Sequence, residues 1–235
     1  MSSDITIKEE RGTVNISEIF FSVQGEGIYS GEPTVFVRFQ GCTLGCEWCD
    51  TKYTWKHEEE NGMSYIEVLN RVWGLHKKSD KKPMICITGG EPLEQPEQFA
   101  YLVKRFHSLD YSIEVETSGL IPVPFEYDQF IDSWVVDFKG PSAAVKKSPV
   151  LSDFTHFRHQ DQLKCVVKDQ KDLDAVRLVL QDNYFRGTIL ISPGNPIKGV
   201  SSTEWMEKCA EFCKQHGYRL SLQTHKFIWG AKRGV

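Results

Sequence analysis

Three cysteines lie close together near residue 45. Cys42, Cys46 and Cys49 form a C-x3-C-x2-C run in the segment GCTLGCEWCDTKYTW, residues 41–55. Thiolates are soft ligands that favour zinc or iron–sulfur clusters. A four-iron cluster that is held by three cysteines keeps one iron without a protein ligand, and an open coordination position is a place for chemistry. The spacing therefore predicts a metal centre with one open position.

A structural zinc site is the other interpretation of these cysteines. It would need a fourth ligand from elsewhere in the chain, and His57 and Cys86 are candidates. Zinc ligands usually come as two C-x2-C pairs, whereas the first gap here has three residues. This difference weakens the zinc interpretation without removing it.

The remaining cysteines lie in apolar segments. Free cysteine is commonly buried as a small hydrophobic residue, and we expect this of Cys86, Cys165, Cys209 and Cys213. His156 and His159 could suggest a metal-binding pair, but no third ligand lies near them in the sequence. We therefore expect these two histidines in a surface loop.

A pair of glycines follows a short apolar run in ITGGEP, residues 87–92. Glycine lets a backbone bend sharply and approach a ligand closely. By itself this motif is typical of an ordinary strand-to-helix turn, with Pro92 at the helix start.

Composition excludes several classes of protein. The chain has 235 residues, 40% of them apolar, which is enough for one sizeable core, and we expect residues 1–235 to form one domain. The net charge of −4 provides no general attraction to nucleic acid or to an anionic membrane. No stretch is apolar enough for a signal core or a membrane span, so we expect a cytoplasmic protein. In that reducing setting, seven cysteines favour metal or catalytic thiols over disulfides.

Short apolar runs alternate with helical patterns along the chain. Strands are predicted at 34–39, 84–88, 112–117, 133–138, 162–167, 188–192 and 219–224, and helices at 64–78, 97–109, 171–181 and 202–217. The alternation predicts an α/β fold with parallel strands. Residues 118–132 contain two prolines and no amphipathic pattern, so we expect no helix there.

The cysteine run and the glycine pair together resemble the radical S-adenosylmethionine superfamily. Its signature is C-x3-C-x2-C with an aromatic residue before the last cysteine, here Trp48, and ITGGEP is similar to its GGE element. The resemblance implies that S-adenosylmethionine chelates the open iron of a [4Fe–4S] cluster. It also implies a partial, open (β/α) barrel with reduced helices and the cluster at the C-terminal ends of the strands.

Longer segments are similar to one family, 7-carboxy-7-deazaguanine synthase. They are residues 20–42, FFSVQGEGIYSGEPTVFVRFQGC, followed by CDTKYTW at 49–55, ETSG at 116–119 and QTHKFIWG at 223–230. The resemblance covers nearly the whole chain. It implies conversion of 6-carboxy-5,6,7,8-tetrahydropterin to 7-carboxy-7-deazaguanine with loss of ammonia, on the route to queuosine. It implies a radical that takes hydrogen from substrate C6 before ring contraction, with the hydrogen then returned to regenerate S-adenosylmethionine.

The resemblance also implies site residues and partners. The expected substrate contacts are Val23, Gln24, Gly25, Glu26, Arg38, Thr88, Glu116 and His225; the S-adenosylmethionine contacts are Gly90, Glu91, Ser118, Asp137 and Lys139; Thr51 is the expected Mg²⁺ ligand. No protein side chain is expected as the catalytic group, because the radical comes from S-adenosylmethionine. An electron donor such as flavodoxin or ferredoxin and a homodimer are also implied.

Several of these residues have simpler interpretations. Arg38 can bind a carboxylate through a charge-assisted fork, but it could also pair with a core acid. The loop around Gln24 could be a glycine-rich turn, Thr51 a turn cap, and a lone His225 structural. Many family members have Ser-Pro-Lys where this chain has Asp137-Phe138-Lys139, so the cofactor contact at Asp137 is left open.

Two other functions compete with this assignment. A glycyl-radical activase also uses a short chain and C-x3-C-x2-C, but it has no use for the Q-G-E-G and Q-T-H-K segments. A non-catalytic zinc-binding module in RNA biology is the second alternative, and metal analysis would separate it from an iron–sulfur enzyme.

Overall fold

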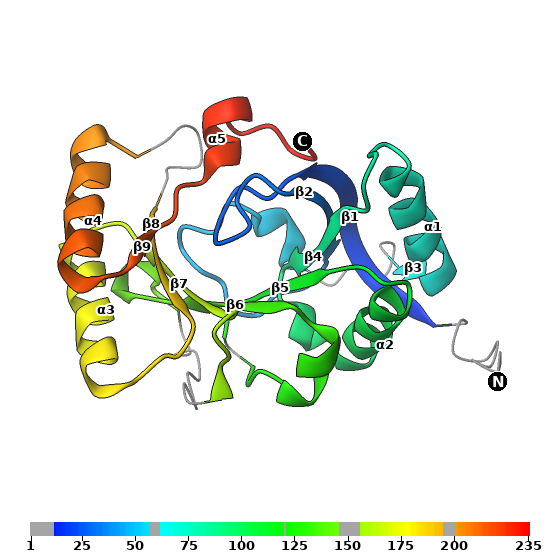
Figure 1. Ribbon diagram of the computed structural model, residues 1–235, viewed down its shortest axis with the longest axis horizontal. Coiled ribbons are helices and arrows are strands. Elements are labelled where there is room, and N and C mark those ends of the chain that lie inside the picture. The colour runs from blue at the N-terminus through cyan, green and yellow to red at the C-terminus, as the bar shows by residue number, and fades with distance from the viewer. Residues whose placement is uncertain (1–11, 57–61, 120, 146–155, 195–200) are drawn as a thin grey trace.

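The computed structural model describes residues 12–56, 62–119, 121–145, 156–194 and 201–235, and one curved sheet runs through them (Figure 1). Its strand order is β3-β1-β2-β4-β5-β6-β7-β8-β9. The strands are β1 (Thr13–Val23), β2 (Pro33–Phe39), β3 (Gly62–Ser64), β4 (Met84–Gly89), β5 (Ile113–Thr117), β6 (Ser133–Phe138), β7 (Gln162–Val167), β8 (Thr188–Pro193) and β9 (Arg219–Leu220). The end strands β3 and β9 do not pair with each other, so the barrel is partial and open. This confirms the expected fold class.

The strands β2, β4, β5, β6, β7, β8 and β9 pair in parallel, as the alternation of strands and helices predicts. Two further strands were not predicted: β1 pairs antiparallel with β2, and β3 pairs antiparallel with β1. The 11 residues of β1 are mostly half-buried and mix polar with apolar side chains, so the segment lacks the short apolar run of a buried strand. The strand β3 has 3 residues, too few to carry a pattern.

Four longer helices confirm the four helical patterns. They are α1 (Tyr65–His76), α2 (Pro96–Ser108), α3 (Gln170–Asp182) and α4 (Thr203–His216). The side chain of Ser64 accepts the Glu67 backbone N–H at the start of α1, and Gly217 ends α4 with a φ of 71°. The helices lie outside the sheet, α1 and α2 near one end and α3 and α4 near the other (Figure 1).

The crossover between β5 and β6 has no α-helix in its described residues. It contains only a six-residue 3₁₀ helix, Phe125–Phe130, as expected for 118–132. The predicted strand 219–224 was too long. It ends at Leu220, and the short helix α5 (Thr224–Trp229) begins at the last of those residues. So short a helix depends on tertiary contacts, here two hydrogen bonds from Thr224 to the carbonyl of Gly25.

Alternation along the strands separates the core from the concave side of the sheet. Val37 and Ile87 are completely buried in the main hydrophobic core, whereas Arg38 and Thr88, which follow them, line a cavity. The carboxyl ends of the parallel strands therefore present polar side chains on the concave side. No helix in the described residues is both long and apolar enough to cross a membrane.

Candidate active site

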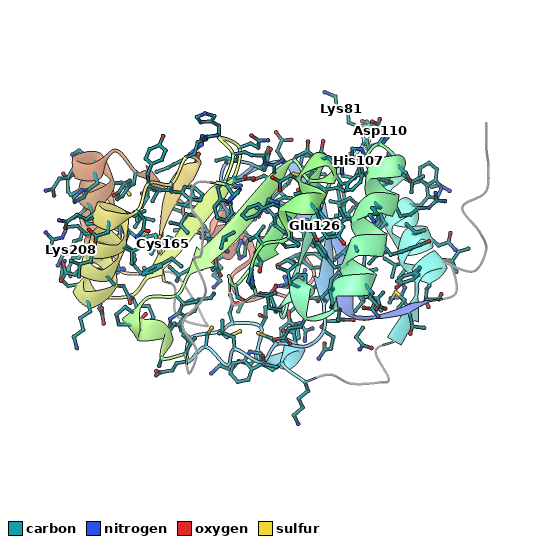
Figure 2. All side chains as sticks on the ribbon, turned by 90° about the horizontal axis from the view of Figure 1, so that it is seen from below. Lys81, His107, Asp110, Glu126, Cys165 and Lys208 are labelled. Atoms are coloured by element: carbon teal, nitrogen blue, oxygen red, sulfur yellow. The ribbon has the colours of Figure 1, made fainter. Side chains whose placement is uncertain are left out.

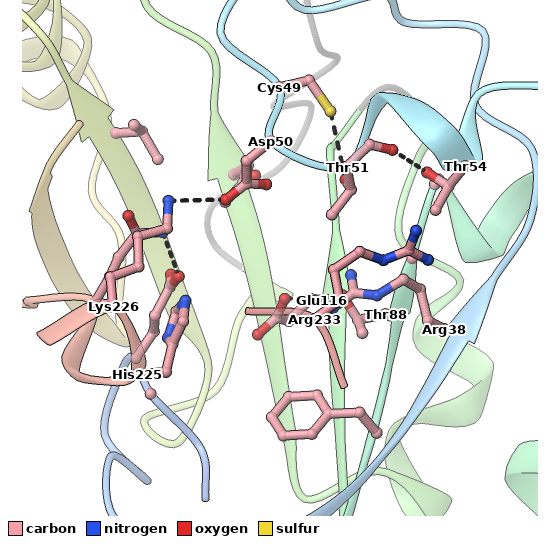
Figure 3. A pocket seen from close by; sticks show the side chains of 18 of the residues that line it. Arg38, Cys49, Asp50, Thr51, Thr54, Thr88, Glu116, His225, Lys226 and Arg233 are labelled. Atoms are coloured by element: carbon pink, nitrogen blue, oxygen red, sulfur yellow. Dashed lines mark hydrogen bonds and ion pairs between the residues drawn. The ribbon is translucent and has the colours of Figure 1, made fainter. Parts of the chain in front are cut away.

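A cavity of about 410 Å³ opens where the parallel strands end (Figure 3). Of the residues that the family resemblance assigns to metal, cofactor or substrate, all but Glu91 line it. They are Val23, Gln24, Gly25, Glu26, Arg38, Cys42, Cys46, Cys49, Thr51, Thr88, Gly90, Glu116, Ser118, Asp137, Lys139 and His225. Segments from both ends of the chain, from Val23 to His225, thus share one site.

The three cysteines lie in the loop that follows β2. Backbone hydrogen bonds from Gly41 to Thr54 (2.6 Å) and from Cys42 to Trp55 (3.1 Å) close this loop on itself. Burial raises the pKa of the Cys42 thiol to about 11 and also raises that of Cys46, where Lys139 opposes the shift. A positively charged metal centre would favour the ionised thiolates.

The three cysteines do not form a preformed site for one zinc ion. In the described part of the chain, the only potential ligand set whose atoms lie within 4.8 Å of one another is Cys86, Glu114 and Glu116. Ligands bound to one zinc at about 2.3 Å lie closer together than that limit. Of the two candidates for a fourth zinc ligand, Cys86 does not line the cavity and His57 lies outside the described residues.

The other cysteines are buried free thiols, as expected. Burial raises the pKa of Cys86, Cys165, Cys209 and Cys213, and none of the four lines the cavity. Figure 2 places Cys165 within the molecule, near α3 and α4. His156 and His159 are exposed, and the ring of His156 stacks on Phe125.

The glycine pair packs directly against the cysteine loop. The backbone N–H of Gly90 donates to Phe39 O (3.0 Å), and that of Glu91 donates to Gly41 O (2.8 Å). A Cβ on residue 90 would lie 2.0 Å from the Gly41 oxygen, so only glycine fits there. The same close approach leaves the Gly90 backbone exposed to the cavity beside the cysteines.

The Glu91 carboxylate points away from the cavity. It is completely buried and accepts hydrogen bonds from the Ser118 backbone N–H (2.8 Å), from the Thr117 hydroxyl (2.9 Å) and from Leu93 N–H (3.0 Å). These bonds hold Ser118 and Thr117, which do line the cavity. The side chain of Glu91 therefore supports the wall of the site.

Four charged side chains form one wall. Lys164 Nζ lies 3.2 Å from Glu26 Oε2 and 3.3 Å from Asp137 Oδ1, and Lys139 Nζ lies 2.5 Å from Asp137 Oδ2. Burial opposes ionisation of Asp137, but Lys139 and Lys164 outweigh it and lower its pKa. Sequence reasoning missed Lys164, although a lysine inside the apolar run QLKCVV is a detectable signal.

A polar network extends from the cavity lining into the buried interior. The Thr88 hydroxyl donates to Glu116 Oε2 (2.9 Å), and Gln24 Nε2 donates to Glu116 (3.4 Å) and to Glu114. Glu114 is buried beside Glu116, and both effects raise its pKa to about 8. Gln162 also donates to it, at 2.9 Å. This network fixes the side chains of Gln24 and Glu116, which were expected to meet the substrate.

Arg38 satisfies both interpretations of its sequence position. Its Nε donates to Glu18 Oε1 at 2.8 Å, so it does pair with an acid, and it also lines the cavity. The Tyr53 hydroxyl donates to the same oxygen at 2.7 Å. Sequence reasoning missed both acceptor and donor: Glu18 belongs to no motif, and Tyr53 lies in the CDTKYTW segment without having been given a role.

The short helix α5 closes another side of the cavity. A Cβ on Gly25 would lie 2.1 Å from His225 Nδ1, so the glycine makes room for the histidine. Burial lowers the pKa of His225, which keeps the ring neutral near pH 7. Lys226 forms a 2.9 Å ion pair with Asp50 in the cysteine loop, and Thr51 Oγ1 lies 3.4 Å from Cys49 Sγ (Figure 3).

Comparisons with known proteins agree with this geometry. The sequence model of the family described as "4Fe-4S single cluster domain" matches residues 23–121. The chain is 38% identical over 226 residues to a 7-carboxy-7-deazaguanine synthase of Thermoplasma acidophilum, covering 94% of this chain and 99% of the relative. It is 31% identical over 240 residues to the enzyme of the same name from Leptospira interrogans, covering 94% and 98%.

A solved structure, QueE from Escherichia coli, has the same fold. Its TM-score is 0.69 at 24% sequence identity, and the match covers 95% of this chain and 100% of the other. Together with the curated relatives, the open barrel and the three-cysteine loop define an iron–sulfur enzyme of the radical S-adenosylmethionine class. At the identities given above, the chain belongs to the 7-carboxy-7-deazaguanine synthase family. This membership decides against a glycyl-radical activase and against a zinc-binding module.

Proposed function

We propose that this protein converts 6-carboxy-5,6,7,8-tetrahydropterin to 7-carboxy-7-deazaguanine with release of ammonia, a step toward queuosine and other deazaguanines. One observation carries the proposal: the residues that the family resemblance assigns to cluster, cofactor and substrate meet at one cavity, with Glu91 supporting its wall. Relatives that bear the name of this enzyme match nearly the full length of the chain.

In this proposal Cys42, Cys46 and Cys49 hold a [4Fe–4S] cluster with one open iron. The donor set fits, since three soft ligands in one loop line the same cavity. The exposed backbone of Gly90 and the hydroxyl of Ser118 bind S-adenosylmethionine beside them. Cluster and S-adenosylmethionine, when bound, supply the one-electron chemistry of the reaction.

Asp137 and Lys139 complete the proposed cofactor side. Their charges compensate each other at 2.5 Å, so together they offer an acceptor and a donor without a net charge. Lys139 also lies over the Trp48 ring, 5.1 Å from its centroid. Asp137 therefore stands where the family resemblance leads us to expect serine, and Lys139 and Lys164 neutralise its charge.

The substrate lies on the opposite side of the cavity. Arg38 binds its carboxylate, while Gln24, Glu26 and Glu116 bind the donors and acceptors of the pterin edge. Thr88 holds Glu116 in place through its 2.9 Å hydrogen bond. Glu26 is itself kept ionised, because Lys164 and Gln223 outweigh its burial and lower its pKa.

Neighbouring backbone and α5 close the proposed substrate site. Val23 and Gly25 contribute the walls of the loop, and His225 contributes a neutral ring that hydrogen-bonds without adding charge. A site shielded from water in this way strengthens each polar contact to the substrate.

Further parts of the proposal concern metal, donor and assembly. Thr51 supplies a hard oxygen for Mg²⁺ next to the cluster loop. An external one-electron donor, a flavodoxin or a ferredoxin, reduces the cluster. The protein works as a homodimer in the cytoplasm, and residues 1–235 of each subunit form one domain. Light scattering of the reconstituted protein tests the dimer, and activity with each purified donor tests the reductant.

The decisive experiment uses anaerobically reconstituted protein. It is incubated with S-adenosylmethionine, Mg²⁺, a reductant and 6-carboxy-5,6,7,8-tetrahydropterin, and products are followed by mass. We expect 7-carboxy-7-deazaguanine and ammonia in equal amounts, with S-adenosylmethionine regenerated. An intact cluster that cleaves S-adenosylmethionine without forming this product would refute the proposal.

A further inference from the structure

One carboxylate, that of Glu18, gathers two arginines at the cavity wall. Its Oε1 accepts from Arg38 Nε (2.8 Å) and from the Tyr53 hydroxyl (2.7 Å), and its Oε2 lies 3.5 Å from Arg233 Nη2. All four side chains line the cavity. Arg38 comes from β2 and Arg233 from near the C-terminus, and Figure 3 shows them close together at the same side of the site.

A β-bulge places Glu18 in this position. The register of β1 on β2 shifts between Ile16 and Glu18, so that Ser17 is an extra residue and Glu18 is the partner of Arg38. Without the bulge Ser17 would face Arg38, and the Glu18 side chain would point to the other face of the sheet. The insertion therefore brings the carboxylate to the cavity.

Glu18 engages only one edge of the Arg38 guanidinium. Among the described residues, Nη1 and Nη2 of Arg38 have no hydrogen-bond partner, although the side chain is only 16% exposed. The ring of Phe20, 5.8 Å away, covers the guanidinium on one side. The free Nη edge is the part of arginine that binds a carboxylate in a two-point fork.

Arg233 is held by a second contact. Its guanidinium carbon lies 3.5 Å from the centroid of the Tyr53 ring, a close cation–π stack. The Tyr53 hydroxyl in turn donates to Glu18, so the ring and the carboxylate both contact the arginine, whose side chain is 57% exposed and open to a ligand. An arginine held in this way can add donors to the same anion that Arg38 binds.

We propose that the substrate's carboxylate is bound between two arginines, Arg38 and Arg233, and that Glu18 is the positioning residue that orients both. This inference rests on the proposed function, because it takes a carboxylated pterin as the ligand. It assigns to Arg233 discrimination between carboxylated and uncarboxylated pterins. The contacts of the two arginines with the substrate's carboxylate then add to the binding energy from the contacts with the pterin edge.

Calorimetry tests the role of Arg233. Anaerobic, reconstituted protein with S-adenosylmethionine is titrated with 6-carboxy-5,6,7,8-tetrahydropterin and, separately, with tetrahydropterin, which lacks the carboxylate. For Arg233→Ala we expect the Kd of the carboxylated ligand to rise about ten- to hundredfold, with the Kd of tetrahydropterin unchanged. Arg219→Ala removes the same charge from exposed β9, outside the cavity, and should change neither value. Unchanged binding in Arg233→Ala, or an equal loss for both ligands, would overturn the inference.

Kinetics test the positioning role of Glu18. Glu18→Gln keeps an acceptor oxygen for Arg38 Nε, whereas Glu18→Ala removes it. We expect KM for the carboxylated substrate to rise in the alanine variant by about tenfold or more, with much of the loss restored by glutamine. Equal defects in both variants would contradict a positioning role through the hydrogen bond.

The two proposals fail in distinguishable ways. If wild-type protein binds the carboxylated pterin but forms no deazaguanine, the proposed reaction is wrong and the carboxylate site can still be measured by calorimetry. If wild-type protein forms the product while Arg233→Ala binds the substrate normally, only the role of Arg233 is wrong.

Discussion

Asp137 and Lys164 are register partners on the parallel strands β6 and β7, and their Oδ1 and Nζ atoms lie 3.3 Å apart. The pairing shows how the structure accommodates an aspartate at this position. Lys139 approaches the other oxygen of the same carboxylate, so Asp137 is neutralised from two sides. Its replacement should therefore disturb stability as well as cofactor binding.

Asp137→Asn should lower the free energy of unfolding by about 3 kcal/mol, because the buried ammonium group of Lys139 loses its ion-pair partner and that of Lys164 keeps only Glu26. The wild-type pKa of Asp137 is lowered, so its contribution is present above the usual aspartate pKa and is lost as pH falls through the folded value. Urea unfolding at several pH values measures both effects. The control is Asp110→Asn, at the surface in Figure 2, where stability should not change. Equal stability of wild type and Asp137→Asn would show that the pair does not contribute.

Glu114→Gln should change the pH dependence of stability. The pKa of Glu114 is raised to about 8 in the folded protein, so between its ordinary value and 8 the folded state keeps a proton that the unfolded state has lost. The contribution of Glu114 to the free energy of unfolding is therefore fully present below the ordinary glutamate pKa. It decreases as pH rises toward 8, by at most about 1.4 kcal/mol per pH unit. The glutamine variant lacks this slope. Urea unfolding at pH 6 and pH 8 compares the two proteins, and parallel losses in both would refute the shift.

Alanine substitutions should separate two kinds of cysteine. Changing Cys42, Cys46 or Cys49 should abolish the visible absorbance and the bound iron and sulfide of reconstituted protein, because each is proposed to ligate the cluster. Cys165→Ala serves as the control, since this thiol is buried in the core away from the cavity. Loss of iron from the Cys165 variant, in protein that is still folded, would contradict a three-cysteine site.

Arg38→Lys should lower product formation by roughly a hundredfold. Lysine keeps the charge, but it cannot donate to Glu18 and present a planar fork at the same time. The cluster should still assemble and S-adenosylmethionine should still be cleaved slowly. The measurement is the ratio of product to 5′-deoxyadenosine in wild type and variant. A ratio and a KM like those of wild type would remove Arg38 from the substrate site.

Thr51→Val should raise the Mg²⁺ concentration needed for half-maximal activity by about tenfold, since a hydroxyl ligand is lost while the shape is kept. Thr51→Ser keeps the hydroxyl and should behave like wild type. The assay is product formation over a Mg²⁺ titration. If valine and serine variants share the wild-type curve, the oxygen beside Cys49 is not a metal ligand.

The parallel strands and the long helices could be predicted because local pattern and tertiary environment agree. The strand 84–88 is apolar because both of its faces are covered, and the α1 start at Ser64 is set by its own cap. The strand β1 could not be recognised because most of its residues are only half-buried, it mixes polar with apolar side chains, and a bulge interrupts its register. The helix α5 is too short to be predicted from its own sequence, and its first residue, Thr224, bonds to Gly25, 199 residues away.

Site residues divide in the same way. Cys42 and Gly90 are detectable because metal ligation and close backbone approach allow few residue types. Glu18 and Arg233 have ordinary local sequences, and only the folded chain brings them 3.5 Å from each other. Lys164 is an intermediate case. The sequence shows a lysine within an apolar strand, but it does not show that Glu26 and Asp137 are its partners.

The contact between Gly90 and Gly41 has a consequence for loop exchange among relatives. Because the Gly41 oxygen leaves no room for a Cβ and accepts the Glu91 N–H, the two loops are fitted to each other atom by atom. If residues 87–92 were replaced by those of another enzyme, the new segment would have to pack against residues 39–42, which are fitted to the original one. To change cofactor preference by recombination, an engineer would have to move residues 39–42 together with residues 87–92.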